Sequence, residues 1–121
     1  MYGDETGNIV PPVIVRTDQN YDQEVFGPVA IVKTFKDLKE AATLANETPF
    51  GLGASIWGSP ELANQLIPEV KSGMVFVNKI VASDARLPFG GVKKSGYGRE
   101  LSRYGLLEFT NIRTVWIQGK P

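Results

Sequence analysis

The glycine-rich run LPFGGVKKSGYGRE, Leu87–Glu100, is the first of three stretches whose residue types could do chemistry. Four glycines and several basic residues could form a loop whose backbone N–H groups hold phosphate. Such loops require G-x-x-x-x-G-K-[ST], or G-x-G-x-x-G directly after a strand. Gly91 and Gly96 have the first spacing, but Tyr97 follows where a lysine is needed. The pattern therefore favours glycines that permit tight turns and close backbone packing.

The other two stretches combine a polar group with a possible recognition partner. In QEVFGP, Gln23–Pro28, the Glu24 carboxylate could accept hydrogen bonds from ribose hydroxyls, and Phe26 could pack on a flat heterocycle. In ASDAR, Ser83 and Arg86 could recognise a carboxylate. From the residues alone, simpler alternatives are favoured. These are a solvated glutamate beside a buried phenylalanine, and a capped turn with a surface arginine.

The residues that are absent limit the chemistry. The 121 residues include no cysteine and no histidine, and 13 basic residues balance 13 acidic ones. Any acid–base or nucleophilic step made by this chain alone must use Asp, Glu, Lys, Tyr, Ser or Thr, and no thiolate metal site is possible. The neutral balance argues against a nucleic-acid or anionic-membrane binder. The absence of a long apolar run or signal peptide predicts a cytoplasmic protein with no membrane partner. Without cysteine and histidine, no metal site is expected either.

Alternating strands and helices must position these stretches. Runs rich in β-branched or apolar residues predict strands over Val13–Thr17, Val29–Phe35, Gly53–Gly58, Gly73–Asn78 and Asn111–Gln118. Both faces of the last strand carry apolar residues, so both are expected to be covered. Strands that alternate with helices indicate an α/β fold with parallel pairing.

Three helices are expected between these strands. The first has Asp37 as its N-cap, ends before Pro49 and presents an apolar face made of Leu38, Ala41, Ala42 and Ala45. The second begins at Ser59 and extends towards Gly73 as its C-terminal cap, with a kink or an early end at Pro68. The third spans about Arg99 to Phe109 and follows the glycine-rich loop.

Taken together, the segments resemble the NAD(P)-dependent aldehyde dehydrogenases. The matching stretches are QEVFGPVAIV, ANETPFGLGASIW, SGMVFVN, LPFGGVKKSGYGRE and YGLLEFTNIRTVWI. Within that family, Val77–Trp116 is most similar to bacterial succinate-semialdehyde dehydrogenases. The resemblance covers about Gly7 to Ile117. It implies part of a three-layer α/β catalytic domain over residues 1–110, and an oligomerisation strand and tail over residues 111–121.

The resemblance also implies a role for individual residues. Glu24 corresponds to the glutamate that hydrogen-bonds the nicotinamide ribose of NAD or NADP, and Phe26 corresponds to the aromatic residue beside the nicotinamide ring. Ser83 corresponds to a serine that binds the substrate carboxylate, and Phe89 to an aromatic residue of the aldehyde tunnel. Asn111–Gln118 corresponds to a strand that joins the sheet of a neighbouring subunit in a homo-oligomer. The glycine-rich loop is then expected near the active-site entrance.

The chain departs from the family in one decisive respect. The family's catalytic cysteine, which attacks the aldehyde, has no counterpart here, and no catalytic residue is assigned to this chain. The first hypothesis is therefore a fragment of an aldehyde dehydrogenase that oxidises succinate semialdehyde or a similar small aldehyde, inactive by itself. A second is a stand-alone, non-catalytic oligomerisation module. A third is an independent nucleotide-binding domain. The sequence leaves open the choice between NAD and NADP.

Overall fold

A computed structural model describes residues 7–20 and 23–120. The elements in chain order are β1 (Val13–Arg16), β2 (Val29–Val32), α1 (Leu38–Asn46), β3 (Gly53–Ile56), α2 (Pro60–Leu66), the 3₁₀ turn η1 (Ile67–Glu69), β4 (Met74–Val77), the 3₁₀ turn η2 (Lys93–Ser95) and α3 (Ser102–Leu107). The predicted alternation of strands and helices is confirmed. The observed strands are shorter than predicted, and α3 covers only the middle of the predicted third helix.

The strands form two separate parallel pairs. β1 pairs with β2, from Val13 opposite Val29 to Arg16 opposite Val32. β3 pairs with β4, from Gly53 opposite Met74 to Ile56 opposite Val77. The predicted parallel pairing is therefore confirmed. It is possible because the connection between the two strands of each pair is long enough to return the chain to the same end.

The helix boundaries follow from local capping chemistry. The Asp37 side chain accepts a hydrogen bond from the Glu40 backbone N–H at 2.8 Å, and the Glu40 carboxylate accepts one from the Lys36 N–H at 2.6 Å. This reciprocal pair is an N-terminal capping arrangement. The Ser59 hydroxyl caps α2 by accepting one hydrogen bond from the Leu62 backbone N–H at 3.3 Å. The predicted early end of the second helix is confirmed, since α2 ends at Leu66, two residues before Pro68. Gly73 is therefore not the C-terminal cap of α2.

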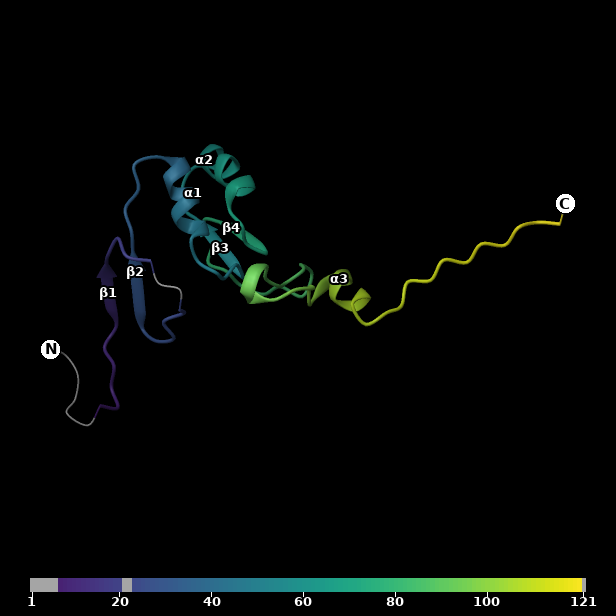
Figure 1. The fold of residues 1–121 in the computed structure, drawn as a ribbon, viewed down its shortest axis with the longest axis horizontal. Coiled ribbons are helices and arrows are strands. Elements are labelled where there is room, and N and C mark those ends of the chain that lie inside the picture. The colour runs from purple at the N-terminus through teal and green to yellow at the C-terminus, as the bar shows by residue number, and fades with distance from the viewer. Residues whose placement is uncertain (1–6, 21–22, 121) are drawn as a thin grey trace.

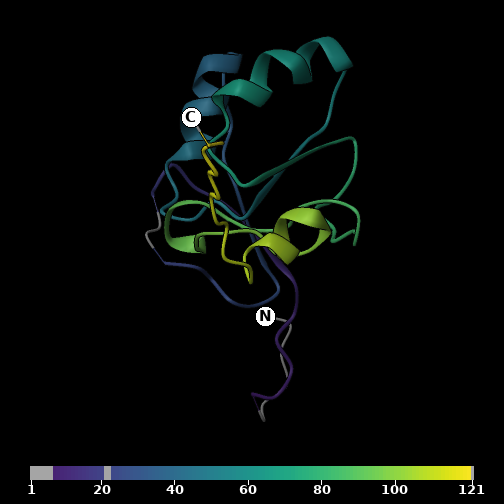
Figure 2. The same ribbon diagram turned by 90° about the vertical axis from the view of Figure 1, so that its right-hand side faces the viewer.

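The helices and the glycine-rich loop lie on opposite sides of the β3–β4 pair. Figure 1 shows α1 and α2 above these strands, with the loop and α3 below them, and Figure 2 shows the same arrangement from a direction turned by 90°. The buried apolar residues of the described chain are Ala42, Ile56, Ala63 and Met74. They come from α1, β3, α2 and β4, so the core lies where these four elements meet.

Much apolar surface remains exposed, above all in the C-terminal segment. Residues 111–120 form neither helix nor strand and extend away from the rest of the chain (Figure 1). Ile112, Val115, Trp116 and Ile117 are 72% to 87% exposed. The prediction of a strand covered on both faces is therefore wrong for this chain by itself. The physical reason is that a strand needs a neighbouring strand to satisfy its backbone, and no described segment lies beside it.

No helix in the described part of the chain is long and apolar enough to span a bilayer.

Candidate functional site

The glycine-rich loop packs directly against the segment that enters β4. A Cβ atom placed on Gly73 would lie 1.9 Å from the carbonyl oxygen of Gly90. Gly90, Gly96 and Gly98 all have positive φ, a backbone conformation that glycine adopts without the steric cost of a side chain. Both observations confirm the interpretation that these glycines permit turns and close packing.

The loop's backbone amides are turned towards the protein. The N–H of Val92 donates to Gly51, and that of Lys94 donates to Pro49, at 3.0 and 3.1 Å. Five further amides of the run also donate to carbonyl oxygens of this chain, those of Leu87, Phe89, Ser95, Gly96 and Glu100. A phosphate-holding loop needs free N–H groups that converge on one point. This loop instead uses the amides of Val92 and Lys94 to join itself to the turn before β3, and other amides to bond within itself.

The Arg99 side chain joins two parts of the loop by hydrogen bonds. Its Nη1 atom donates to the carbonyl oxygens of Gly91 and Gly98, at 2.9 and 2.6 Å. The adjacent residue Glu100 exchanges two backbone hydrogen bonds of 2.8 Å with Phe89. Phe89 is therefore held at a defined place, half-buried at the base of the loop. The sequence indicated the basic character of this stretch. It did not indicate that the Arg99 guanidinium donates to backbone carbonyl oxygens of the same loop.

Phe89 lines a cavity of about 370 Å³ beside β4. Phe76 and Lys79 contribute to its wall, together with Ala82 and Asp84 from the turn that follows. The Lys79 Nζ atom lies 6.0 Å from the centre of the Phe76 ring, within range of a cation–π contact. The cavity thus combines two aromatic rings with a cation and a carboxylate. The exposed Ser83 lies between two lining residues in sequence but does not itself line the cavity.

The turn after Ser83 is organised by Asp84. The backbone N–H of Arg86 donates to Oδ1 of Asp84 at 2.9 Å, and the N–H of Leu87 donates to the Asp84 carbonyl oxygen at 2.9 Å. The Arg86 guanidinium then makes a two-point contact with the same carboxylate, Nε to Oδ1 at 2.9 Å and Nη2 to Oδ2 at 2.6 Å. This confirms the capped turn with a surface arginine, the simpler alternative for this stretch.

The electrostatics of the turn follow from that contact. Hydrogen bonds from the Arg86 side chain, and then from its backbone N–H, hold the pKa of the Asp84 carboxyl well below its ordinary value. The same contact raises the pKa of the Arg86 guanidinium. Asp84 is therefore ionised whenever the protein is folded near neutral pH. Asp84 was not among the predicted site residues, although its position two residues before an arginine was a signal for such a turn.

A second cleft, of about 570 Å³, contains Glu24. Gln23 and Glu24 form one wall; the other walls come from the end of α1, the segment into β3, the entry to β4 and η2. Glu24 is exposed, and within the described residues no group donates a hydrogen bond to its carboxylate. Ala45 is likewise exposed because it lines this cleft rather than the core.

The structure does not bring the predicted site residues into one space. Glu24 lines the larger cleft and Phe89 the smaller cavity, and these share no lining residue, although Ser72 lines one and Gly73 the other. Phe26 is 96% exposed and lines neither. The simpler alternative of a buried phenylalanine is therefore wrong. A free carboxylate and a free aromatic face two residues apart fit the chemistry of a ribose hydroxyl pair and a flat ring.

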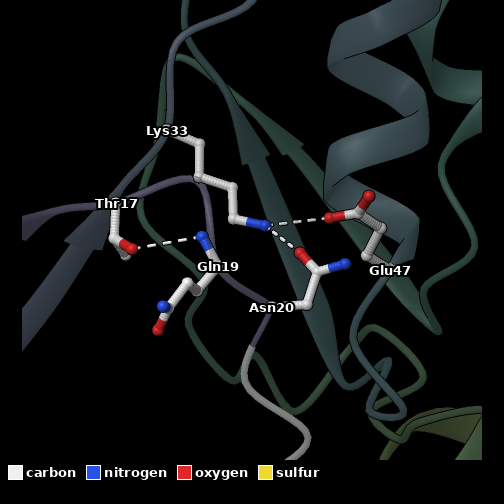
Figure 3. A network of polar contacts seen from close by, with 5 residues as sticks. All are labelled: Thr17, Gln19, Asn20, Lys33 and Glu47. Atoms are coloured by element: carbon white, nitrogen blue, oxygen red, sulfur yellow. Dashed lines mark hydrogen bonds and ion pairs between the residues drawn. The ribbon is translucent and has the colours of Figure 1, made fainter.

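A polar network holds β2 against the end of α1. Figure 3 shows the Lys33 ammonium between Glu47 and Asn20, with the Gln19 N–H donating to the Thr17 hydroxyl at 3.1 Å. Lys33 Nζ lies 2.9 Å from Glu47 Oε2 and also donates to Asn20 Oδ1. This network fixes the segment that precedes the Glu24 loop. Across the described ranges, no group of acidic, histidine or cysteine side chains could hold a metal ion.

Comparison with known proteins identifies related sequences over almost the whole chain. The model of the aldehyde dehydrogenase family matches residues 1–115. A probable succinate-semialdehyde dehydrogenase [NADP(+)] of Synechocystis is 52% identical over 120 residues, which are 94% of this chain and 26% of that protein. A succinate semialdehyde dehydrogenase [NAD(P)+] of Escherichia coli is 48% identical over 115 residues, 91% of this chain and 25% of that protein.

Solved structures agree with the sequence matches. The crystal structure of succinic semialdehyde dehydrogenase from Streptococcus pyogenes, in complex with NADP+, superimposes with a TM-score of 0.88 at 39% identity. The match covers 98% of this chain and 27% of that one. The small α/β structure described above therefore has the fold of the corresponding part of an aldehyde dehydrogenase. The chain spans about a quarter of the length of the curated relatives it matches.

Proposed function

Because the chain belongs to the aldehyde dehydrogenase family, we propose that it is part of an NAD(P)-dependent enzyme that oxidises succinate semialdehyde to the dicarboxylic acid. The observation that carries this proposal is the 52% identity to the Synechocystis relative across 94% of the chain. Residues 1–110 would be the C-terminal part of the catalytic domain. The exposed apolar surface supports this placement, since an apolar surface of this extent needs a cover.

In this proposal the chain binds and orients, and the nucleophile comes from elsewhere in the enzyme. The chain has no cysteine, so the thiol of the covalent step must belong to another segment. Bound NAD(P) supplies the acceptor for the aldehyde hydride. Glu24 would accept hydrogen bonds from the nicotinamide ribose, and Phe26 would pack beside the ring. Ser83 would donate a hydrogen bond from its hydroxyl to the substrate carboxylate, and Phe89 would exclude water from the aldehyde's path.

The first experiment measures aldehyde oxidation by the complete enzyme with succinate semialdehyde and either NAD+ or NADP+, followed by absorbance of the reduced nicotinamide. Glu24→Gln should raise the KM for the cofactor or slow hydride transfer by about five- to tenfold, because a hydrogen bond to a charged acceptor is replaced by a weaker one to a neutral amide oxygen. Glu61→Gln, an exposed glutamate outside the cleft, is the matched control. Unchanged cofactor kinetics in Glu24→Gln would remove the role of Glu24. Failure to oxidise any aldehyde would overturn the proposed function.

The C-terminal segment favours a second role in assembly. Residues 111–120 present exposed apolar side chains and unpaired backbone groups, which suits strand addition to a neighbouring subunit. We propose that these residues join subunits into a homo-oligomer. Removing residues 111–121 from the complete enzyme should lower the mass measured by light scattering, and an unchanged mass would contradict this role. Co-elution of this chain, expressed alone, with the complete enzyme would favour the non-catalytic module.

A further inference from the structure

The cavity at Phe89 has an unusual charge arrangement. Among the described residues that line it, only Lys79 and Asp84 carry charge. The side chain of Asp84 is 29% exposed, so its carboxylate is partly withdrawn from water at the cavity wall. A carboxylate at this position repels any anion that enters, unless another group compensates its charge.

Arg86 supplies that compensation from outside the cavity. Its side chain is 86% exposed and does not line the cavity, yet it contacts both carboxylate oxygens of Asp84. Such a planar two-point contact is among the strongest that an arginine makes with a carboxylate. The pair as a whole is neutral. The positive charge of Lys79 therefore remains uncompensated among the groups that line the cavity.

We propose that Arg86, by neutralising Asp84, gives this cavity its preference for an aldehyde that carries a carboxylate. The inference rests on the proposed function and adds a residue that determines substrate charge. Ser83 does not line the cavity, but it stands between Ala82 and Asp84, which both do, and it is the residue proposed to bind the substrate carboxylate at this wall. An unpaired Asp84 would place a second negative charge beside that group. Arg86 acts through Asp84 and does not itself touch the substrate.

The two partners of the ion pair can be removed one at a time with little change in shape. Asp84→Asn keeps the side-chain oxygen that accepts the backbone N–H of Arg86, so the turn should persist. Arg86→Gln keeps a donor that can reach Asp84. Asp84→Asn leaves a free cation beside the cavity, and Arg86→Gln leaves a free anion. The two variants therefore change the local charge in opposite directions.

The experiment compares two aldehydes of equal chain length in the complete enzyme. Succinate semialdehyde carries a carboxylate where butanal has a methyl group. The ratio of their KM values isolates the effect of charge from effects on folding or on the reacting carbonyl. Arg86→Gln should raise the KM of succinate semialdehyde relative to that of butanal by about fivefold, the effect expected of one partly exposed charge pair.

Asp84→Asn should move the same ratio in the other direction. The double variant, in which both charges are gone, should return towards the wild-type ratio. Lys79→Gln should reduce the preference for succinate semialdehyde, because it removes the uncompensated cation. Succinate and butyrate, tested as competitive inhibitors, provide the same comparison without turnover.

The matched control is the other ion pair in the described chain, Lys33 with Glu47, which lines no part of this cavity. Lys33→Gln and Glu47→Gln should leave the KM ratio unchanged. If Arg86→Gln and Asp84→Asn shift the KM of both aldehydes together, the pair is only structural and the inference is wrong. If the wild-type enzyme oxidises butanal but not succinate semialdehyde, the substrate proposal and this inference both fail. If it oxidises no aldehyde, the proposed function itself fails.

Discussion

Gly73→Ala tests whether the contact between β4 and the glycine-rich loop positions the substrate cavity. The added Cβ would lie 1.9 Å from Gly90 O, 2.8 Å from its carbonyl carbon and 2.9 Å from Gly91 Cα. All three are backbone atoms, so no side chain can rotate away. Ordinary contacts begin at 3.4 Å, so the two segments must separate by about 1.5 Å, the difference between that limit and the shortest distance.

A separation of this size disrupts hydrogen bonds that converge on Gly51. Its carbonyl oxygen accepts from the N–H of Gly73 at 2.9 Å and from that of Val92 at 3.0 Å. The strain of overpacking costs about 1 to 3 kcal/mol, and each lost hydrogen bond about 1 kcal/mol. We therefore expect Gly73→Ala to lower the free energy of unfolding by roughly 2 to 5 kcal/mol.

The assay is urea unfolding of the complete enzyme, followed by its kinetics at a temperature where both proteins are folded. Because Phe89 precedes Gly90, the KM for the aldehyde should rise while the KM for the cofactor changes little. The matched control is Gly58→Ala, whose Cβ would meet only the flexible Leu62 side chain at 3.4 Å or more. A Gly73→Ala variant as stable as wild type, with an unchanged KM for the aldehyde, would refute this account of the loop.

Three further predictions concern polar contacts. Asn46→Ala removes two 2.7 Å hydrogen bonds that join the end of α1 to the segment before β4, and should cost about 2 kcal/mol in urea unfolding. Lys33→Gln should cost less than about 1 kcal/mol in the same assay, because the pair with Glu47 is partly exposed. Since its contact with Arg86 lowers the pKa of Asp84, the pair is intact above the ordinary aspartate pKa of about 3.9 and is lost only at more acidic pH. The KM ratio of succinate semialdehyde to butanal should therefore be constant from about pH 6 to about pH 9, where the substrate carboxylate also stays ionised, and a change across neutral pH would contradict this.

Most secondary-structure elements were predictable because their signals are local. The Asp37 and Ser59 caps act within one helical turn. Pro68 likewise acts locally, because it ends α2 two residues before its own position. The order of strands and helices follows from such signals, as does their parallel pairing. The predicted strand at Asn111–Gln118 had the same local pattern. It does not form here because no described segment lies beside it to pair with its backbone.

The candidate site was predictable only in part. The QEVFGP and ASDAR stretches drew attention to Glu24 and Ser83, and the resemblance assigned roles to them. The spacing of Asp84 and Arg86 was a signal for a turn, but it did not indicate that the guanidinium would contact both carboxylate oxygens, since a long side chain can point in many directions. Nor did the sequence indicate that Glu24 and Phe89 line separate spaces.

By itself, the sequence determined the elements, their caps, the absence of a thiol nucleophile and the similarity to the aldehyde dehydrogenases. Each of these depends on residue identity or on neighbours within a few positions. Only the tertiary structure decided that Gly73 meets Gly90, that the loop's amides turn inward and that the Asp84 charge at the cavity wall is cancelled from outside. These features depend on the path of the chain between distant segments, and that path is set by how the segments pack.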